Sequence, residues 1–337
     1  MSDVIDRFRR WVASDPALPA LDAQTEAFCR RRLRESADLL ARKVELELGD
    51  RRHVPLGRVL VVIAEHDVLG TVAGLVAATI TGNRVRIKAR TTRALVEDVV
   101  RALAIADCEV LDWDSRDDDD HLDGIDGVLL AGGDALIRRY RRATQPGVRL
   151  IEFGPKLSCA AIGQGADLAR VADALVTDVT LFGQGVCSSP QWILVEDPAI
   201  ASHLRDRLAA CGPLAEGDRL IQLVRAQELR LLGRLGEPIE VAVDPRTGWG
   251  VMVSHSLGHR LPRGFAVVVG PLAGQLAAVA QLAPHGLQTL GVAGRVPAAP
   301  GFTHRCPIGR MHERSILEPH DGMLELAALV HFVSEEP

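Results

Sequence analysis

The sequence is poor in lysine, and its cysteines are scattered. Lysine occurs only at positions 43, 88 and 156, among 39 basic residues. A lysine kept where arginine is the default cation is a candidate functional residue, because an ammonium and a guanidinium suit different partners. The six cysteines form no C-x-x-C pair and no Cys/His cluster. This argues against a disulfide framework or a metal site, and for a reducing compartment.

Long apolar runs and an excess of basic charge are also missing. No stretch approaches the ~20 apolar residues of a transmembrane helix, and the first 15 residues lack the apolar core of a secretory signal. We therefore expect a cytoplasmic protein without membrane insertion. The net charge of −5 gives no reason to expect nucleic-acid binding. With 337 residues, 47% of them hydrophobic, the chain can form two domains with real cores.

Apolar runs alternate with amphipathic segments along most of the chain. In the first half we expect strands over 58–64, 84–89, 108–113, 127–132 and 149–154, and helices over 20–47, 70–81, 92–106 and 134–143. The second half predicts strands over 159–163, 191–196, 238–243, 248–254, 266–270 and 288–294, and helices that include a last one near 322–333. Nearly all-apolar strands separated by helices indicate an α/β fold with parallel sheets covered on both faces. A domain boundary is expected near 153–157.

One cysteine lies in a loop of small residues. Cys187 follows Gly183-Gln184-Gly185 and precedes Ser188-Ser189-Pro190, between an expected helix and an expected strand. Backbone N–H groups in such a loop can converge on one point, which lowers a thiol pKa and forms an oxyanion hole. The pattern favours a functional thiol. The alternative is a buried small apolar residue, which is our interpretation of the other five cysteines.

Charged residues and glycines follow several expected strands. Glu152 ends one strand, Lys88 and Arg90 end another, and Gly132-Gly133 follows a third. The carboxyl ends of parallel strands form the crevice where α/β sheets bind ligands, and a lysine–arginine pair there suits a ribose or phosphate. Plain alternatives stay open: a solvated glutamate, a basic strand edge, and a glycine pair without the G-x-G-x-x-G fingerprint.

Four motifs in this order resemble those of the aldehyde dehydrogenase superfamily. They are G-N-x-V-x-x-K at 82–88, Gly-Gly at 132–133, E-x-G-x-K-x-S at 152–158 and the Gly-Gln string that leads to Cys187. Two longer strings, Phe-Gly-Pro-Lys at 153–156 and Cys-Ser-Ser-Pro-Gln at 187–191, resemble its bacterial acyl-CoA reductase branch, typified by the fatty-acid reductase of luminescence. The resemblance runs from about residue 55 to 332.

The resemblance implies an aldehyde-dehydrogenase-like fold with two Rossmann-like sheet domains. The cofactor-binding domain would span 1–154 with N-terminal helices, and the catalytic domain 155–337 with a C-terminal helix. Cys187 would be the acylated nucleophile, and Glu152 would occupy the superfamily's general-base position. The residues that would contact a nicotinamide cofactor are Lys88, Arg90, Gly132, Gly133 and Gly154.

One position departs from the superfamily's pattern. Where the superfamily has an asparagine that holds the oxyanion, this sequence reads Glu65-His66-Asp67, with Asp67 in the matching slot as a third catalytic candidate. A carboxylate there would repel the developing negative charge. A protonated Asp67, a donor His66 or the loop N–H groups alone would each resolve this conflict. Asp67 is equally expected as the N-cap of the next helix.

These observations predict an NADPH-dependent reductase that converts an acyl thioester, acyl-CoA or acyl-carrier protein, to an aldehyde. The two cations Lys88 and Arg90 favour NADPH, whose 2′-phosphate they suit, over NADH. The alternatives are an aldehyde dehydrogenase acting oxidatively, with Glu152 activating water, and a non-catalytic family member that serves as a partner or scaffold. We expect a homo-oligomer, a dimer or larger.

Overall fold

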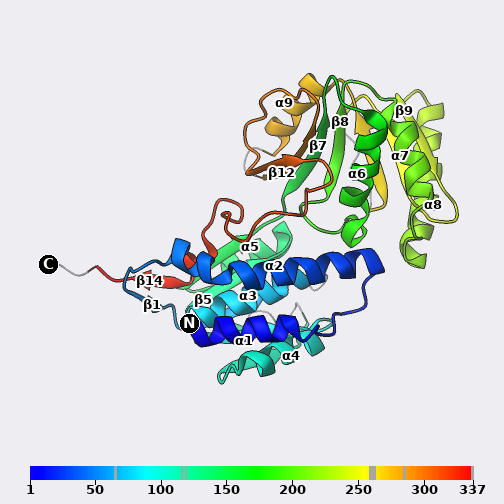
Figure 1. Ribbon diagram of the computed structural model, residues 1–337. Coiled ribbons are helices and arrows are strands. Elements are labelled where there is room, and N and C mark those ends of the chain that lie inside the picture. Colours follow the sequence, from blue (N-terminus) through cyan, green and yellow to red (C-terminus); the bar gives the residue numbers. More distant parts are fainter. Residues whose placement is uncertain (64–66, 115–116, 118–119, 258–262, 284–285, 335–337) are drawn as a thin grey trace. The chain divides into compact units, whose positions relative to one another are not determined.

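The computed structural model describes residues 1–63, 67–114, 117, 120–257, 263–283 and 286–334 (Figure 1). The chain divides into two compact units: Met1–Pro155 together with the stretch that begins at Ser315, and Lys156–Arg314. The sequence predicts a boundary after residue 154 and places the C-terminal stretch in the second domain. The structure differs on the second point, since that stretch packs with the first unit.

The first unit is built around a five-stranded parallel sheet. Its strands, in spatial order, are β4 (Cys108–Leu111), β3 (Arg84–Lys88), β2 (Arg58–Val62), β5 (Gly127–Ala131) and β6 (Arg149–Phe153). The strand order reverses between β2 and β5. At such a reversal, doubly wound sheets bind ligands outside the carboxyl ends of their strands.

Helices cover both faces of this sheet because successive strand residues point to opposite sides. Val59 and Val61 of β2 belong to the core under four helices, which are α1 (Ser2–Ala13), α2 (Ala23–Glu47), α3 (Val68–Ile80) and α4 (Arg93–Leu103). Leu60 and Val62 belong to the core on the other side, with Ile137 of α5 (Asp134–Ala143).

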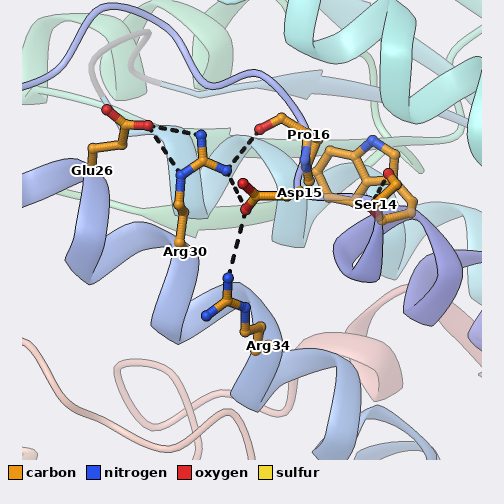
Figure 2. Close-up of polar contacts among 7 residues, drawn as sticks. Ser14, Asp15, Pro16, Glu26, Arg30 and Arg34 are labelled. Atoms are coloured by element: carbon orange, nitrogen blue, oxygen red, sulfur yellow. Dashed lines mark hydrogen bonds and ion pairs between the residues drawn. The ribbon is translucent and has the colours of Figure 1, made fainter.

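One arginine fixes the link between α1 and α2 (Figure 2). Arg30 of α2 donates to the Asp15 carboxylate at 2.6 Å and to the Pro16 carbonyl at 3.0 Å. Its other donors bind Glu26 of the same helix. Asp15 has a φ of 54°, a left-handed conformation that aspartate tolerates better than most residues. The contact therefore holds the chain in the turn that joins the two N-terminal helices.

A buried ion cluster joins α2 to the C-terminal stretch. The ammonium of Lys43 donates to Glu47 Oε1 at 2.5 Å and to the carbonyl of Ile316 at 3.1 Å. Glu47 Oε2 accepts from the N–H of Leu326 at 2.6 Å, in α10 (Glu325–Ala328). Lys43 and Glu47 are both buried, so the loss of either would leave an uncompensated charge in the core. This cluster is a physical reason that the C-terminal stretch belongs to the first unit.

The C-terminal stretch ends in a strand, where the sequence predicts one helix near 322–333. The structure has only the four-residue helix α10, followed by β14 (Val330–Phe332), which pairs antiparallel with β1 (His53–Pro55). The apolar spacing here is compatible with a helix. Pairing with a strand far upstream in the chain overrides that local pattern, as tertiary context often does.

The second unit contains a seven-stranded mixed sheet. Its strands, in spatial order, are β13 (His304–Pro307), β12 (Leu287–Ala293), β7 (Leu157–Ile162), β8 (Pro190–Val195), β11 (Phe265–Val269), β10 (Gly250–Ser254) and β9 (Ile239–Val243). All neighbours are parallel except β9, which runs antiparallel to β10. One face packs against α6 (Leu168–Thr180) and α7 (Ile200–Ala209), and the other against α8 (Glu216–Arg234) and α9 (Leu272–Leu282).

The α/β fold class is confirmed, and most predicted elements occur within a few residues of their expected bounds. Three short strands, β1, β13 and β14, are not among the predicted elements, because three or four residues carry too little pattern to reveal a strand. Among the described residues, no helix combines the length and apolarity needed to span a membrane.

Candidate active site

The loop that carries Cys187 connects α6 to β8 through a short 3₁₀ turn, η2 (Leu181–Gln184). Three consecutive residues, Phe182, Gly183 and Gln184, have φ angles of 58°, 55° and 61°. This conformation strains a residue with a side chain, and such strain persists only where the surroundings fix it. Contacts with the surrounding residues therefore hold the backbone of this loop in a strained conformation.

The buried side chain of Gln184 fixes the loop. Its amide nitrogen donates to the carbonyls of Pro190 and Phe265 at 3.1 and 2.8 Å. Its amide oxygen accepts from the N–H of Gly264 at 2.7 Å. One side chain thus ties the loop to its own exit into β8 and to the neighbouring strand β11. This role explains a glutamine three residues before the thiol.

The backbone of Cys187 is also anchored. Its carbonyl accepts from the hydroxyl of Ser158 at 2.6 Å, and the Ser158 oxygen accepts from the N–H of Thr289 at 3.1 Å. Ser158 is fully buried at the start of β7. The loop backbone is therefore tied to the amino ends of β7 and β12 as well, and it precedes β8 rather than following a strand.

Cys187 is the exposed cysteine, and the other five are buried or half-buried. Burial raises the pKa of Cys29 and of Cys159 to about 12, and that of Cys108 to about 11. Burial also raises the pKa of Cys211. Only a thiolate is a good nucleophile, so these four thiols are poorly suited to act as nucleophiles at neutral pH. Exposure singles out Cys187.

A histidine binds the residue next to the thiol. Ser188 Oγ lies 2.8 Å from Nδ1 of His312, and Nε2 of His312 lies 2.9 Å from the carbonyl of Asp178. Burial lowers the pKa of His312, so the ring is neutral at pH 7. Because a carbonyl can only accept, Nε2 carries the proton and Nδ1 accepts from the Ser188 hydroxyl. The direction of that hydroxyl is thereby fixed.

The carboxylate of Asp178 ties the turn after β13 to α6. Its two oxygens accept from the N–H groups of Gly309 and Met311 at 2.5 and 3.0 Å. Burial raises the pKa of Asp178 to about 7, against these two hydrogen bonds, which lower it. Neither Asp178 nor His312 is among the residues predicted from the sequence. Asp178 had a signal, as a charge in an apolar helix end, whereas nothing local marks His312.

In the first unit, Lys88 and Arg90 lie at the carboxyl end of β3. The Lys88 ammonium is 5.1 Å from the ring centroid of Trp113, and Arg90 donates to Asp112 at 2.9 Å. The ion pair of Arg90 is partly exposed, with 57% of the arginine side chain accessible. Exposed pairs of this kind contribute little to stability, so an anionic ligand can compete with Asp112 for Arg90.

Two of the three glycines of the predicted cofactor site leave open space. Among the described residues, and apart from the two chain neighbours of each glycine, no heavy atom lies within 4 Å of the Cβ position at Gly133 or Gly154, whereas a Cβ on Gly132 would come within 2.5 Å of the Leu136 side chain. Helix α5 begins directly after Gly133 and has no side-chain cap. Its first N–H groups therefore lie at the switch point beside β5, where they suit a phosphate, although Asp134 in the first turn opposes one.

Glu152, the predicted general base, is bound by an arginine. Arg141 of α5 donates through Nε and Nη2 to the two carboxylate oxygens, at 2.7 and 2.5 Å. The hydrogen bonds and charge of Glu152 raise the pKa of Arg141. A carboxylate held in both of its oxygens has fewer lone pairs for a water molecule. This arrangement makes Glu152 less suited to activate water than an unbound carboxylate.

Asp67 is the N-cap of α3. Its carboxylate accepts from the N–H of Gly70 at 2.8 Å, and its carbonyl accepts from the hydroxyl of Thr71 at 2.8 Å. The capping interpretation of Asp67 therefore matches the structure, and the oxyanion-slot interpretation stays a prediction. The neighbouring Glu65 and His66 lie outside the described residues, and with them the proposal that His66 donates instead.

The candidate residues fall into two groups. Cys187 lies in the second unit. Those placed at the carboxyl edge of the first unit's sheet are Asp67, Lys88, Arg90, Gly132, Gly133, Glu152 and Gly154. Within the part of the chain that the structure describes, no three His, Cys, Asp or Glu side chains converge as metal ligands.

Solved structures share this fold. Proline utilization A of Bradyrhizobium japonicum superimposes with a TM-score of 0.76 at 17% identity, over 97% of this chain and 42% of that one. An NAD-dependent aldehyde dehydrogenase of Sinorhizobium meliloti gives 0.75 at 13%, over 98% and 80%. Glyceraldehyde-3-phosphate dehydrogenase GapN of Methanocaldococcus jannaschii, complexed with NADP, gives 0.67 at 9%, over 97% and 84%. This chain thus spans about two fifths of the proline utilization A chain.

These likenesses define an aldehyde-dehydrogenase-like α/β fold. The sequence profile of the acyl-CoA reductase (LuxC) family matches residues 23–332. The chain therefore belongs to the acyl-CoA reductase (LuxC) family, and the resemblance drawn from its motifs is confirmed. No curated protein sequence matches it closely enough to count as a relative.

Proposed function

We propose that this protein reduces an acyl thioester to an aldehyde through an acyl group carried on Cys187, with NADPH as the preferred reductant. The observation that carries the proposal is an exposed thiol on a loop whose backbone is fixed by buried hydrogen bonds. A nucleophile needs both access and a fixed position. Family membership supports a thioester, of CoA or of a carrier protein, as the substrate.

In this reaction the sulfur of Cys187 attacks the thioester carbonyl carbon. The bond to the CoA or carrier sulfur breaks, that thiolate leaves and takes a proton, and the acyl group stays on the enzyme. Backbone N–H groups of the loop stabilise the oxyanion. After reduction the product is a hemithioacetal on Cys187. Its oxygen loses a proton, the C–S bond breaks, and aldehyde and thiol are released.

The first unit supplies the cofactor site in this proposal. When bound, the nicotinamide cofactor provides the hydride that reduces the acyl carbon. Gly133 and Gly154 leave open space of the kind that a dinucleotide needs, and Lys88 and Arg90 would bind the ribose with its 2′-phosphate. Both an NAD-dependent enzyme and an NADP complex occur among the proteins of similar fold, which supports a nicotinamide cofactor of either kind.

The oxidative alternative needs a base that activates water. Glu152 is the residue at the matching position, and the bidentate contact with Arg141 occupies both of its oxygens. A reductase has no need to hydrolyse its acyl intermediate, so a bound Glu152 favours the reductive direction. The remaining alternative, a non-catalytic scaffold, predicts no turnover at all.

Mass spectrometry of the intact protein tests the proposal directly. Wild type mixed with acyl-CoA or acyl-carrier thioester should gain the mass of one acyl group, and added NADPH should remove it with release of aldehyde. Cys187→Ala should gain nothing and lose at least about a thousandfold in turnover, whereas Cys211→Ala, a matched cysteine control, should behave as wild type. An equal adduct on Cys187→Ala would place the nucleophile elsewhere. Hydrolysis of the thioester with no aldehyde formed would support neither the reductive nor the oxidative reaction.

A further inference from the structure

Helix α8 of the second unit exposes its more apolar side. Towards the sheet it buries Gln222, Ala226 and Leu229. On the opposite side, exposed fractions lie between 53% and 74% for Leu220, Ile221, Val224, Leu231 and, just past the helix end, Leu235. An ordinary surface helix has the reverse pattern, with its apolar side towards the core. A group of exposed apolar residues of this kind marks a site of interaction.

The exposed apolar residues form one stripe along the helix. At 100° per residue, four of them fall within about 60° of one another on the helical wheel, and these are Leu220, Val224, Leu231 and Leu235. The 19 residues of α8 give it a length of about 28 Å. Within its unit α8 packs beside β9, the last strand in the order of the seven-stranded sheet (Figure 1). The stripe therefore runs along the outer side of that unit.

Two leucines of the stripe are placed symmetrically about the centre of the helix. The midpoint of α8 falls near Arg225 and Ala226, and Leu220 and Leu231 lie at equal distances from it. A two-fold axis through that midpoint would place Leu220 of one helix opposite Leu231 of an identical, antiparallel helix. Interfaces between identical subunits related by a two-fold axis are self-complementary in this way.

The charges at the two ends of the stripe are also self-complementary. Glu216 at the start and Arg234 at the end lie on the same side of the wheel, next to the leucines, and both are exposed. Within the described part of the chain, neither forms an ion pair. In an antiparallel pair, Glu216 of each helix would lie beside Arg234 of the other, which gives two intersubunit ion pairs.

We propose that the α8 face is a two-fold interface between two copies of this chain, with the two α8 helices packed antiparallel. The inference is independent of the proposed chemistry, since it uses no residue of the candidate active site. An acidic carrier protein would call for a basic surface. The α8 stripe instead pairs one acidic end with one basic end, which is what a second copy of the same helix matches.

Sedimentation velocity of the full-length protein, over a concentration series from below to above 10 μM, tests the interface. Wild type should sediment as a dimer or a larger even assembly. Leu231→Glu should shift that assembly to half its mass. Leu282→Glu is the matched control, because Leu282 is 62% exposed at the end of α9, away from the stripe, and it should leave the assembly unchanged. Circular dichroism should show both variants folded.

A charge exchange tests the antiparallel arrangement. Glu216→Arg and Arg234→Glu should each raise the dissociation constant about tenfold, since each places like charges together at both ends. The double variant should restore the wild-type value, because it re-forms both pairs in reverse. A monomeric wild type, a dimer that survives Leu231→Glu, equal disruption by Leu282→Glu, or no rescue by the double exchange would each overturn the proposal. Binding of the α8 face to a different protein, with this chain alone monomeric, would do so too.

Discussion

The two units hold their candidate residues in opposite ways. At the sheet edge of the first unit, Arg90 and Glu152 each bind an oppositely charged side chain, in contacts that water reaches. Around the loop of the second unit, Gln184, Ser158 and His312 form largely buried hydrogen bonds, most of them to backbone groups. Exposed ion pairs exchange readily with a ligand, whereas buried hydrogen bonds fix a conformation. The first arrangement suits a cofactor that comes and goes, and the second suits a nucleophile that must stay in place.

Among the buried contacts of the second unit, those of Asp178 should contribute most to the free energy of unfolding. Asp178→Asn places an amide N–H₂ against a backbone N–H donor and should lower the free energy of unfolding by about 2–3 kcal/mol. The loss should depend on pH. With its pKa raised from 3.8 to about 7, native Asp178 keeps a proton that the unfolded chain has lost, so this group's contribution to wild-type stability falls as the pH rises through 7. Asparagine lacks that dependence.

Urea unfolding at pH 5 and pH 8 measures this difference. The gap between wild type and Asp178→Asn should be smaller at pH 8 than at pH 5. A gap of the same size at both values would mean that Asp178 is already ionised at pH 5.

Among the exposed contacts of the first unit, a change at Arg90 should alter the preference for NADPH over NADH. In the proposed cofactor site Arg90 binds the 2′-phosphate, so Arg90→Ala should lower kcat/KM for NADPH about tenfold while leaving NADH unchanged. Steady-state kinetics with both cofactors measures it. Arg93→Ala is the matched control, since Arg93 forms an exposed pair with Glu97 on the next helix. Equal kcat/KM for both cofactors in wild type would contradict this assignment.

A double-mutant cycle sharpens the contrast in the second unit. Ser188→Ala and His312→Ala each remove one end of a single hydrogen bond, so their combined effect on the free energy of unfolding should be less than additive by about 1 kcal/mol. Thermal or urea unfolding of the four proteins gives the coupling. Strict additivity would show that the contact contributes nothing.

Asp67 tests whether a residue at the first unit's edge acts as more than a helix cap. Asp67→Asn keeps a good N-cap and adds an amide donor, so the reduction rate at pH 7–8 should stay the same or rise. Asp67→Ala should lower the rate and destabilise the protein by about 1 kcal/mol. Loss of turnover in a folded Asp67→Asn that still binds cofactor would show that the carboxylate itself is required.

The smallest effect is expected at Glu152. Glu152→Gln should change the rate of thioester reduction by less than about threefold, because no step of the reduction needs a base that activates water. Arg141→Ala, which releases the carboxylate, should instead increase hydrolysis of the acyl enzyme in the absence of cofactor. Free acid quantified in both variants separates the two. A large loss of reduction in Glu152→Gln would assign the carboxylate a direct role.

Local patterns were enough to predict the sheets and the cysteine loop. Apolar runs as long as those of β2 or β8 predict a strand from the local sequence alone. The string of residues around Cys187 is likewise specific by itself. Long-range choices were not predictable. Helix α5 carries four arginines, and only packing against β6 selects Arg141 to bind Glu152. Likewise, nothing near His312 in the sequence reveals that Ser188 lies beside it.

The discontinuity of the first unit affects the order in which the protein can be completed during synthesis. Lys43 and Glu47 are made early, but Ile316 and Leu326, which bind them, emerge only after the whole of Lys156–Arg314. Domains usually fold as units while the ribosome is still working. Here the second unit has its full sequence first, while the first unit waits with two ionised side chains lacking their final backbone partners. A nascent chain arrested before Ser315 should therefore be a preferred substrate for chaperones and proteases, even though its second unit is complete.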